Sequence, residues 1–196
     1  DLALTNVDIQ GGPQVGALAA EAINSTFDTI TVTGRVGDAV ADADYVGGIA
    51  GELQQSDLTN SSFTGTIDSD ITSEIFQYIG GLAGYLFDGT ISGGTFNGSI
   101  AANGGTSGTN ERSIGGIVGS DLGLVSDSTA TGTISVTGQG ITQVGGLVGR
   151  GLSTDAISNS QAAVDIDVVM TGDELVSAGG LVGVASVSIL DSSASG

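Results

Sequence analysis

A short glycine-rich phrase recurs along the chain at a nearly constant spacing. Successive copies begin 31, 33, 35, 30 and 34 residues apart. Repeats of this length are typical of a solenoid, in which each unit buries its apolar face against its neighbours. The copies read VGGIAG from Val46, IGGLAG from Ile79, IGGIVG from Ile114, VGGLVG from Val144 and AGGLVG from Ala178, with a degenerate VGALAA from Val15.

The paired glycines of this phrase have a structural interpretation. A residue without Cβ fits where the backbone turns or approaches a neighbouring coil closely. We therefore predict a set of structural repeat glycines, which comprises Gly47, Gly48, Gly80, Gly81, Gly115, Gly116, Gly145, Gly146, Gly179 and Gly180.

A second motif lies between the glycine phrases, as in INSTFDTITV from Ile23, LTNSSFTGTI from Leu58 and ISGGTFNGSI from Ile91. Aligning its copies places Ile23 beside Leu58 and Phe27 beside Phe63, and it gives an apolar column followed, one or two residues later, by a column of Asn, Asp or Gly. These residue types tolerate the left-handed backbone of a tight corner. The alignment predicts a corner ladder of Asn6, Asn24, Asn60, Asp127, Asn159 and Asp191.

The apolar columns predict the fold. Alternation with period two, as in Thr29-Ile30-Thr31-Val32, indicates half-buried strands. We predict an all-β chain that forms a single parallel β-solenoid (β-helix) of about six coils of 30–35 residues. Residues 1–196 form one repeat domain in this interpretation, excised from or continuing into a longer array.

The amino-acid composition excludes some classes of binding partner. The 22 acidic residues against three arginines give a net charge of −19. Nucleic acids and anionic membranes are bound through Lys and Arg, so this charge argues against both partners. No apolar run reaches the roughly 18 residues of a membrane span, so membrane insertion is not expected.

The glycine phrase resembles the GLUG motif, named for its Gly-Leu-any-Gly core. Gly146-Leu147-Val148-Gly149 and Gly180-Leu181-Val182-Gly183 match that core directly, and three further copies match with conservative changes. The resemblance implies a β-solenoid of the kind found in large bacterial and archaeal surface proteins. It also implies an adhesive or stalk role, and it offers no catalytic residues to carry over.

Few side chains that could act in catalysis are available, because the chain contains neither His nor Cys. Asp165 and Asp167 lie two residues apart on one strand face, roughly the separation of an inverting glycosidase pair. Alternating Asp residues on an exposed face are nevertheless ordinary. We predict no catalytic residues and a chain that is not an enzyme.

No cofactor is predicted, although calcium is a weak alternative. Asp38, Asp42 and Asp44 cluster in one loop, and hard cations prefer several oxygen ligands at once. Neither the EF-hand pattern nor the calcium-binding nonapeptide repeat is present. Solvated counter-ions around an acidic surface are the simpler interpretation.

The sequence thus predicts a non-catalytic structural or adhesive repeat module at the surface of a microbial cell. Its partners would be neighbouring repeats, or a glycan or protein ligand at the loop edge. Tyr45, Phe76, Tyr78 and Tyr85 are the candidate aromatic contacts there, although Tyr45 and Tyr78, which directly precede the glycine phrases, are better explained as covers of the core. Two alternatives stay open: a filament subunit that stacks head to tail, and a carbohydrate-binding or carbohydrate-cleaving β-helix.

Overall fold

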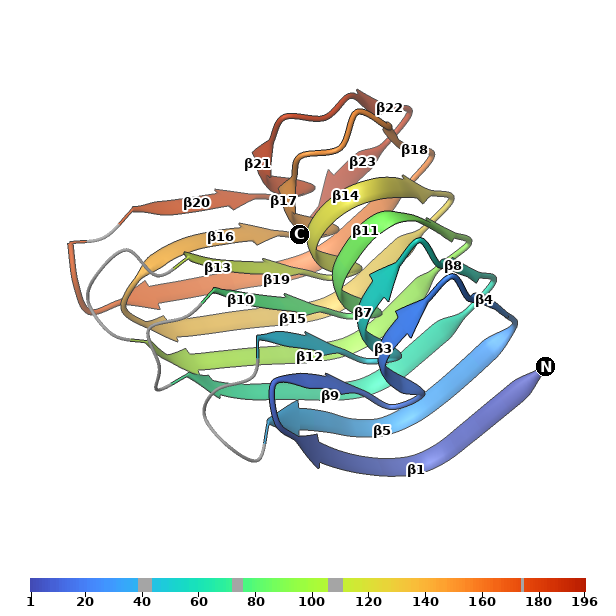
Figure 1. The fold of residues 1–196 in the computed structure, drawn as a ribbon. Coiled ribbons are helices and arrows are strands. Elements are labelled where there is room, and N and C mark those ends of the chain that lie inside the picture. Colours follow the sequence, from blue (N-terminus) through green and yellow to red (C-terminus); the bar gives the residue numbers. More distant parts are fainter. Residues whose placement is uncertain (39–43, 72–75, 106–110, 174) are drawn as a thin grey trace.

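The chain is a stack of parallel strands wound around one axis in a computed structural model (Figure 1). The structure describes residues 1–38, 44–71, 76–105, 111–173 and 175–196. Within these residues the chain forms strands and no helix, and all the strand pairs are parallel. The predicted parallel β-solenoid of about six turns is confirmed.

The described strands form three sheets, and sheets A and B have one strand per coil. Sheet A contains β1 (Leu2–Gly11), β5 (Ile30–Asp38), β9 (Ser62–Ile71), β12 (Thr95–Gly104), β15 (Thr129–Gly138), β19 (Gln161–Met170) and β23 (Ser193–Ser195). Sheet B contains β2 (Gln14–Gly16), β6 (Tyr45–Gly47), β10 (Gln77–Gly80), β13 (Glu111–Gly115), β16 (Ile141–Gly145) and β20 (Val176–Gly179).

Sheet C follows sheet B directly, on the other side of the glycine phrase. Its main strands are β3 (Ala19–Ile23), β7 (Ala50–Gln54), β11 (Ala83–Ser92), β14 (Val118–Ser126), β17 (Val148–Gly151) and β21 (Val182–Ala185). Four short strands complete its edge: β4 (Thr26–Asp28), β8 (Asp57–Thr59), β18 (Ile157–Ser158) and β22 (Ile189–Leu190). No described segment forms a helix long and apolar enough to cross a bilayer.

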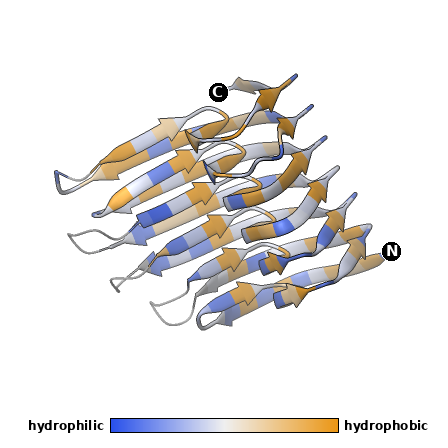
Figure 2. Cartoon of the chain, turned by 45° about the horizontal axis from the view of Figure 1, so that its top comes forward, coloured by the Kyte–Doolittle hydropathy of each residue, from blue (hydrophilic) through white to orange (hydrophobic). Residues whose placement is uncertain are grey.

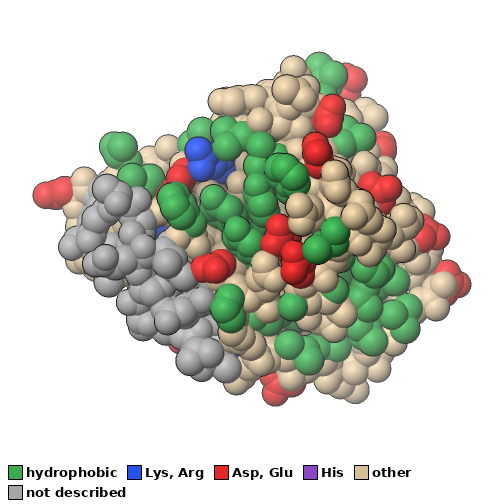
Figure 3. Space-filling model, in the orientation of Figure 1, with side chains coloured by type: hydrophobic (Ala, Val, Ile, Leu, Met, Phe, Trp, Pro, Cys, Tyr) green, Lys and Arg blue, Asp and Glu red, His purple; other side chains and the backbone are tan. Residues whose placement is uncertain are grey.

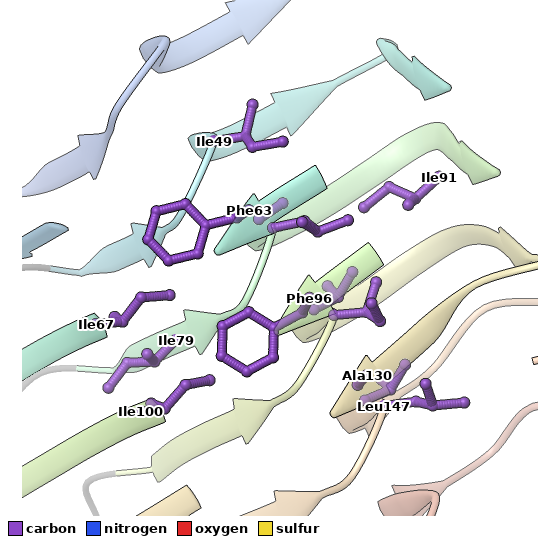
Figure 4. Close-up of a cluster of buried hydrophobic side chains, with 14 of the residues drawn as sticks. Ile49, Phe63, Ile67, Ile79, Ile91, Phe96, Ile100, Ala130 and Leu147 are labelled. Atoms are coloured by element: carbon purple, nitrogen blue, oxygen red, sulfur yellow. The ribbon is translucent and has the colours of Figure 1, made fainter. Parts of the chain in front are cut away.

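The core consists of columns in which equivalent residues of successive coils lie against one another. Hydrophobic and hydrophilic residues alternate along the strands (Figure 2), so one side chain in two points inward. Phe63 and Phe96, paired between β9 and β12, stack with ring centroids 6.2 Å apart. Ile67 and Ile100 form the next column of the same strands, and all four side chains are buried (Figure 4).

The register of the first coil differs from the sequence alignment. The alignment placed Ile23 beside Leu58, whereas Leu58 pairs with Phe27. Phe63 likewise pairs with Val32 rather than with Phe27. The physical reason is a glycine column: a Cβ on Gly65 would lie 1.8 Å from the carbonyl oxygen of Gly34. This close approach determines the register more strictly than apolar character, which several offsets satisfy.

The predicted corner ladder is accordingly wrong for two of its six members. Asn24 begins a separate left-handed column that continues with Gln55 and Asp88. Asn6 lies in a β-bulge of β1, between Leu4 and Val7. Thr29 occupies the corner position that was predicted for Asn24. Asp28 pairs with Thr59, so the residues that follow them, Thr29 and Asn60, are equivalent. The members that share one column are Asn60, Gly93, Asp127, Asn159 and Asp191.

Candidate functional site

The glycine phrase forms the bend between sheets B and C. In the third coil, β10 ends at Gly80 and β11 begins at Ala83. A Cβ on Gly80 would lie 1.9 Å from the carbonyl oxygen of Ala83, and one on Gly81 would lie 1.9 Å from that of Gly116. The first glycine therefore permits the bend, and the second permits contact between coils.

The other predicted repeat glycines are placed in the same way. The first glycines, Gly47, Gly115, Gly145 and Gly179, would put a Cβ 1.9–2.2 Å from the carbonyl oxygen three residues later. The second glycines, Gly48, Gly116 and Gly146, would put a Cβ 2.1–2.3 Å from the equivalent carbonyl oxygen of the next coil, and Gly180 would meet the Cβ of Ala194 at 2.9 Å. No residue with a side chain fits at these positions without moving the backbone.

The corner between sheets C and A is stabilised by a set of serines, which we call the serine ladder: Ser61, Ser128 and Ser160, which are buried, and Ser192, which is partly exposed. Each hydroxyl accepts a hydrogen bond from the backbone N–H of the equivalent residue in the preceding coil, at 3.0–3.1 Å. Each also donates to the carbonyl oxygen two residues before it, at 2.6–2.9 Å. The ladder replaces the strand-to-strand bonds that the left-handed corner interrupts.

Four aromatic side chains meet on the outer faces of sheets B and C, and we call them the aromatic cluster: Tyr45, Tyr78, Tyr85 and Phe87. The rings of Tyr45 and Tyr78 are stacked with centroids 5.5 Å apart. Tyr85, from sheet C, lies 5.3 Å from Tyr45 and 5.5 Å from Tyr78. Outward-facing side chains of two adjacent sheets can touch only if the outer faces of the two sheets are inclined toward each other. The bend at the glycine phrase produces this inclination.

The aromatic cluster is half-buried rather than covered. Phe87 is 36% exposed, and the three tyrosines are intermediate. Burial raises the pKa of Tyr45 to about 12 and raises the pKa values of Tyr78 and Tyr85, so these phenols remain neutral. The space-filling view from this side shows hydrophobic side chains gathered over sheets B and C, with acidic and basic groups among them (Figure 3).

Polar side chains border the aromatic cluster at both ends. Gln14 donates to Glu52 at 2.7 Å, and burial, followed by the charge of Glu21, raises the pKa of Glu52. At the other end, Arg150 forms a 2.9 Å ion pair with Glu111, which also accepts from Gln143. The face therefore combines aromatic rings with carboxylate, amide and guanidinium groups, a composition common in ligand-binding surfaces.

The sequence placed three of these rings at the loop edge, and the structure places them on strands. Tyr45 begins β6, Tyr78 lies in β10 and Tyr85 lies in β11. Phe76, the fourth candidate, is 57% exposed and precedes β10. The sequence did not single out Phe87 as a surface contact, although its alternation with buried Leu86 indicated an outward position.

The calcium hypothesis stays a prediction. Asp42 lies outside the described residues, as does the side chain of Asp38, while the backbone N–H of Asp44 donates to the carbonyl oxygen of Pro13 at 2.7 Å. The described residues contain no group of three or more carboxylates that could hold a metal ion. If calcium binds, adding a chelator lowers the melting midpoint, and an unchanged midpoint removes the hypothesis.

The Asp165 and Asp167 side chains are both exposed on the outer face of β19. An open surface depression beside the last strands adjoins β19, and its lining includes Asp165 but not Asp167. The remaining lining residues are mostly Val, Ile, Ala and Gly. Both carboxylates lie on the same exposed face of β19, and the carbohydrate-cleaving alternative stays a prediction.

Two buried polar residues escaped the sequence analysis. Arg112 is 1% exposed and donates to the carbonyl oxygens of Gly104 and Thr137 and to the hydroxyl of Thr142, thereby linking the turns of neighbouring coils. Asp121 is fully buried and pairs with Leu86 in a column of inward-facing residues. An acidic residue in an apolar column was the signal that could have identified it.

The stacked coils and the glycine bend define the class of protein. The family model of the GLUG motif matches residues 42–68, which include β6, β7 and β8. The chain is a GLUG-motif repeat β-solenoid, as the resemblance indicated.

A relative found among characterised proteins is "Halomucin" from Haloquadratum walsbyi. It is 33% identical over 196 residues, and the alignment covers 95% of this chain and 2% of that protein. This chain therefore spans a small fraction of its relative. No solved structure matches the chain.

Proposed function

We propose that the chain is a non-catalytic structural module of an extracellular microbial surface protein, where its stacked coils act as a rigid spacer. The observation that supports this role most directly is the unbroken series of paired strands in sheet A, from β1 to β23. Neighbouring coils are joined through backbone ladders and buried columns, and most of them also through the serine ladder. Such a structure transmits force along its axis without needing a ligand.

Charge and family support the extracellular setting. A net charge of −19 keeps a protein soluble and separated from similar neighbours, including at high ionic strength. The GLUG motif and the similarity to halomucin are consistent with a surface protein. Antibody labelling of intact cells tests the location: we expect labelling without permeabilisation, and labelling only after permeabilisation would contradict the proposal.

The aromatic cluster favours a second candidate, an adhesive role in which sheets B and C contact a carbohydrate. Rings flanked by amide, carboxylate and guanidinium groups suit a neutral, hydroxyl-rich ligand. A glycan array compares the wild-type chain with Tyr85→Ala and with the matched control Tyr85→Phe, which keeps the ring. The adhesive candidate predicts binding that Tyr85→Ala abolishes and Tyr85→Phe retains. If the wild-type chain binds no glycan on the array, the adhesive candidate is rejected and the spacer role remains.

The filament alternative stays a prediction. Electron microscopy of the native material separates isolated particles from fibres that continue along the solenoid axis.

A further inference from the structure

Asp121 is a carboxylic acid inside an otherwise apolar column of sheet C. Leu53 pairs with Leu86, Leu86 with Asp121, and Asp121 with Gly151. Both leucines and Asp121 are fully buried. One carboxylate oxygen, Oδ1, accepts a hydrogen bond from the N–H of Gly123 at 2.8 Å. The other, Oδ2, is buried and has no hydrogen-bond partner among the described residues.

The column is interrupted directly beside this carboxyl group. The pairing of β14 with β17 stops at Asp121 and Gly151, and pairing with β18 resumes at Val125 and Ile157. Residues 122–124 of one coil thus face the longer segment 152–156 of the next. Within that stretch the structure shows one backbone bond between the two coils, from the N–H of Leu152 to the carbonyl oxygen of Asp121 at 2.9 Å. We call residues 152–156 the long corner.

The charges around Asp121 all favour its neutral form. Asp155, in the long corner, is the charged group whose field acts on it. Arg150 is turned away toward Glu111, and Asp88, at the corner of the preceding coil, is exposed. Burial is the main cause that raises the pKa of Asp121, to about 7, and the negative charge of Asp155 is a smaller one. The hydrogen bond from the backbone N–H of Gly123 acts in the opposite direction and lowers this pKa. A carboxyl group in solution has a pKa near 3.9.

We propose that Asp121 is a pH-sensitive latch: its neutral carboxyl group keeps the long corner closed, and its ionisation loosens that corner. The direction follows from proton linkage. The closed state binds a proton that the open state releases, so raising the pH from about 4 to about 7 favours opening, and no further change is expected above that range. The weak point is the long corner, because its ladder is already interrupted and its own carboxylate, Asp155, repels the new charge.

Hydrogen exchange measured by mass spectrometry tests the latch on the full chain. Exchange in residues 152–156, corrected for the intrinsic pH dependence, is compared at about pH 5 and about pH 7. The opening equilibrium of the wild-type chain should rise roughly tenfold per pH unit over this interval. Asp121→Asn, which keeps the shape without the charge, should abolish the rise. The matched control Asp127→Asn removes an exposed carboxylate at the neighbouring corner, between sheets C and A, and should leave the rise intact.

Two results would overturn the latch: a wild-type long corner with no such rise, or an equal rise in Asp121→Asn. If Asp121→Asn does not fold, a carboxyl ¹³C NMR titration of the wild-type chain takes its place. One carboxyl group, that of Asp121, should titrate near neutral pH. The absence of a neutral-range titration would equally refute the proposal.

Discussion

Replacing Ser128 by alanine tests whether the serine ladder joins the coils. Ser128 is fully buried. Its hydroxyl accepts from the N–H of Gly94 at 3.1 Å and donates to the carbonyl oxygen of Ser126 at 2.7 Å. Alanine keeps the backbone and removes both bonds, which leaves the N–H of Gly94 buried without a partner.

The magnitude follows from that orphaned amide. A buried donor without a partner costs about 1–3 kcal/mol, so we expect Ser128→Ala to lower the free energy of unfolding by about 2 kcal/mol. For a chain of this length that corresponds to a fall of about 4–8 °C in melting temperature. Far-ultraviolet circular dichroism during thermal and urea unfolding measures both quantities.

The matched control is Ser99→Ala, at a half-exposed position on the outer face of sheet A. It should change stability by less than about 0.5 kcal/mol. If Ser128→Ala is as mild as this control, the serine ladder does not stabilise the stack and our account of the corner is wrong.

Three further substitutions test other parts of the structure, each by its urea unfolding midpoint. Thr29 adopts a left-handed φ of 60°, which strains a β-branched residue, so Thr29→Asn should raise stability by about 1 kcal/mol, and a loss would contradict the revised register. Gly98→Ala puts a Cβ 1.9 Å from the carbonyl oxygen of Gly65 and should cost more than about 4 kcal/mol, whereas Gly12→Ala, with nothing within 4 Å, should be neutral. Arg112→Met leaves buried acceptors without a donor and should cost about 3 kcal/mol; a neutral result would show that these bonds are dispensable.

The repeat architecture could be predicted from the sequence because its causes are local and recur in every coil. The glycine phrase keeps its spacing because a side chain at its first glycine, such as Gly80, would collide with backbone atoms in each coil, whereas the first coil has Ala17 at the second position. The corner residues that share a column all tolerate a left-handed backbone, as Asn60 and Asp127 show with φ of 48° and 51°. Because the same structural constraint recurs in each coil, the sequence contains several copies of the same motif.

The first coil was misaligned because its corner lacks the usual residues. Thr29 stands where later coils have Asn, Asp or Gly, while Asn24 offers a misleading match five residues earlier. Gly34, which pairs with Gly65, was the reliable marker. A column that excludes Cβ atoms is a better guide to register than a column of similar side chains.

The contacts across the bend could not be predicted from the sequence. Tyr78 and Tyr85 are in contact because the glycine bend inclines the outer faces of sheets B and C toward each other. The acidity of Asp121 likewise depends on burial and on Asp155 in another coil, neither of which the sequence displays. Spacing along the chain predicts which residues share a column, but not how two sheets are inclined to each other.

The central claim is that each coil lies directly on the preceding one. Thr33, Thr64, Asn97, Thr131 and Ala163 form one outward column of sheet A. Spin labels placed on Thr33 and on each of the other positions in turn should give backbone separations that grow by about 4.8 Å per coil, to about 19 Å at Ala163. Pulsed electron paramagnetic resonance, with cysteine variants of this naturally cysteine-free chain, measures the longer separations. A regular increase along this series supports the solenoid, and separations that do not increase in coil order would contradict it.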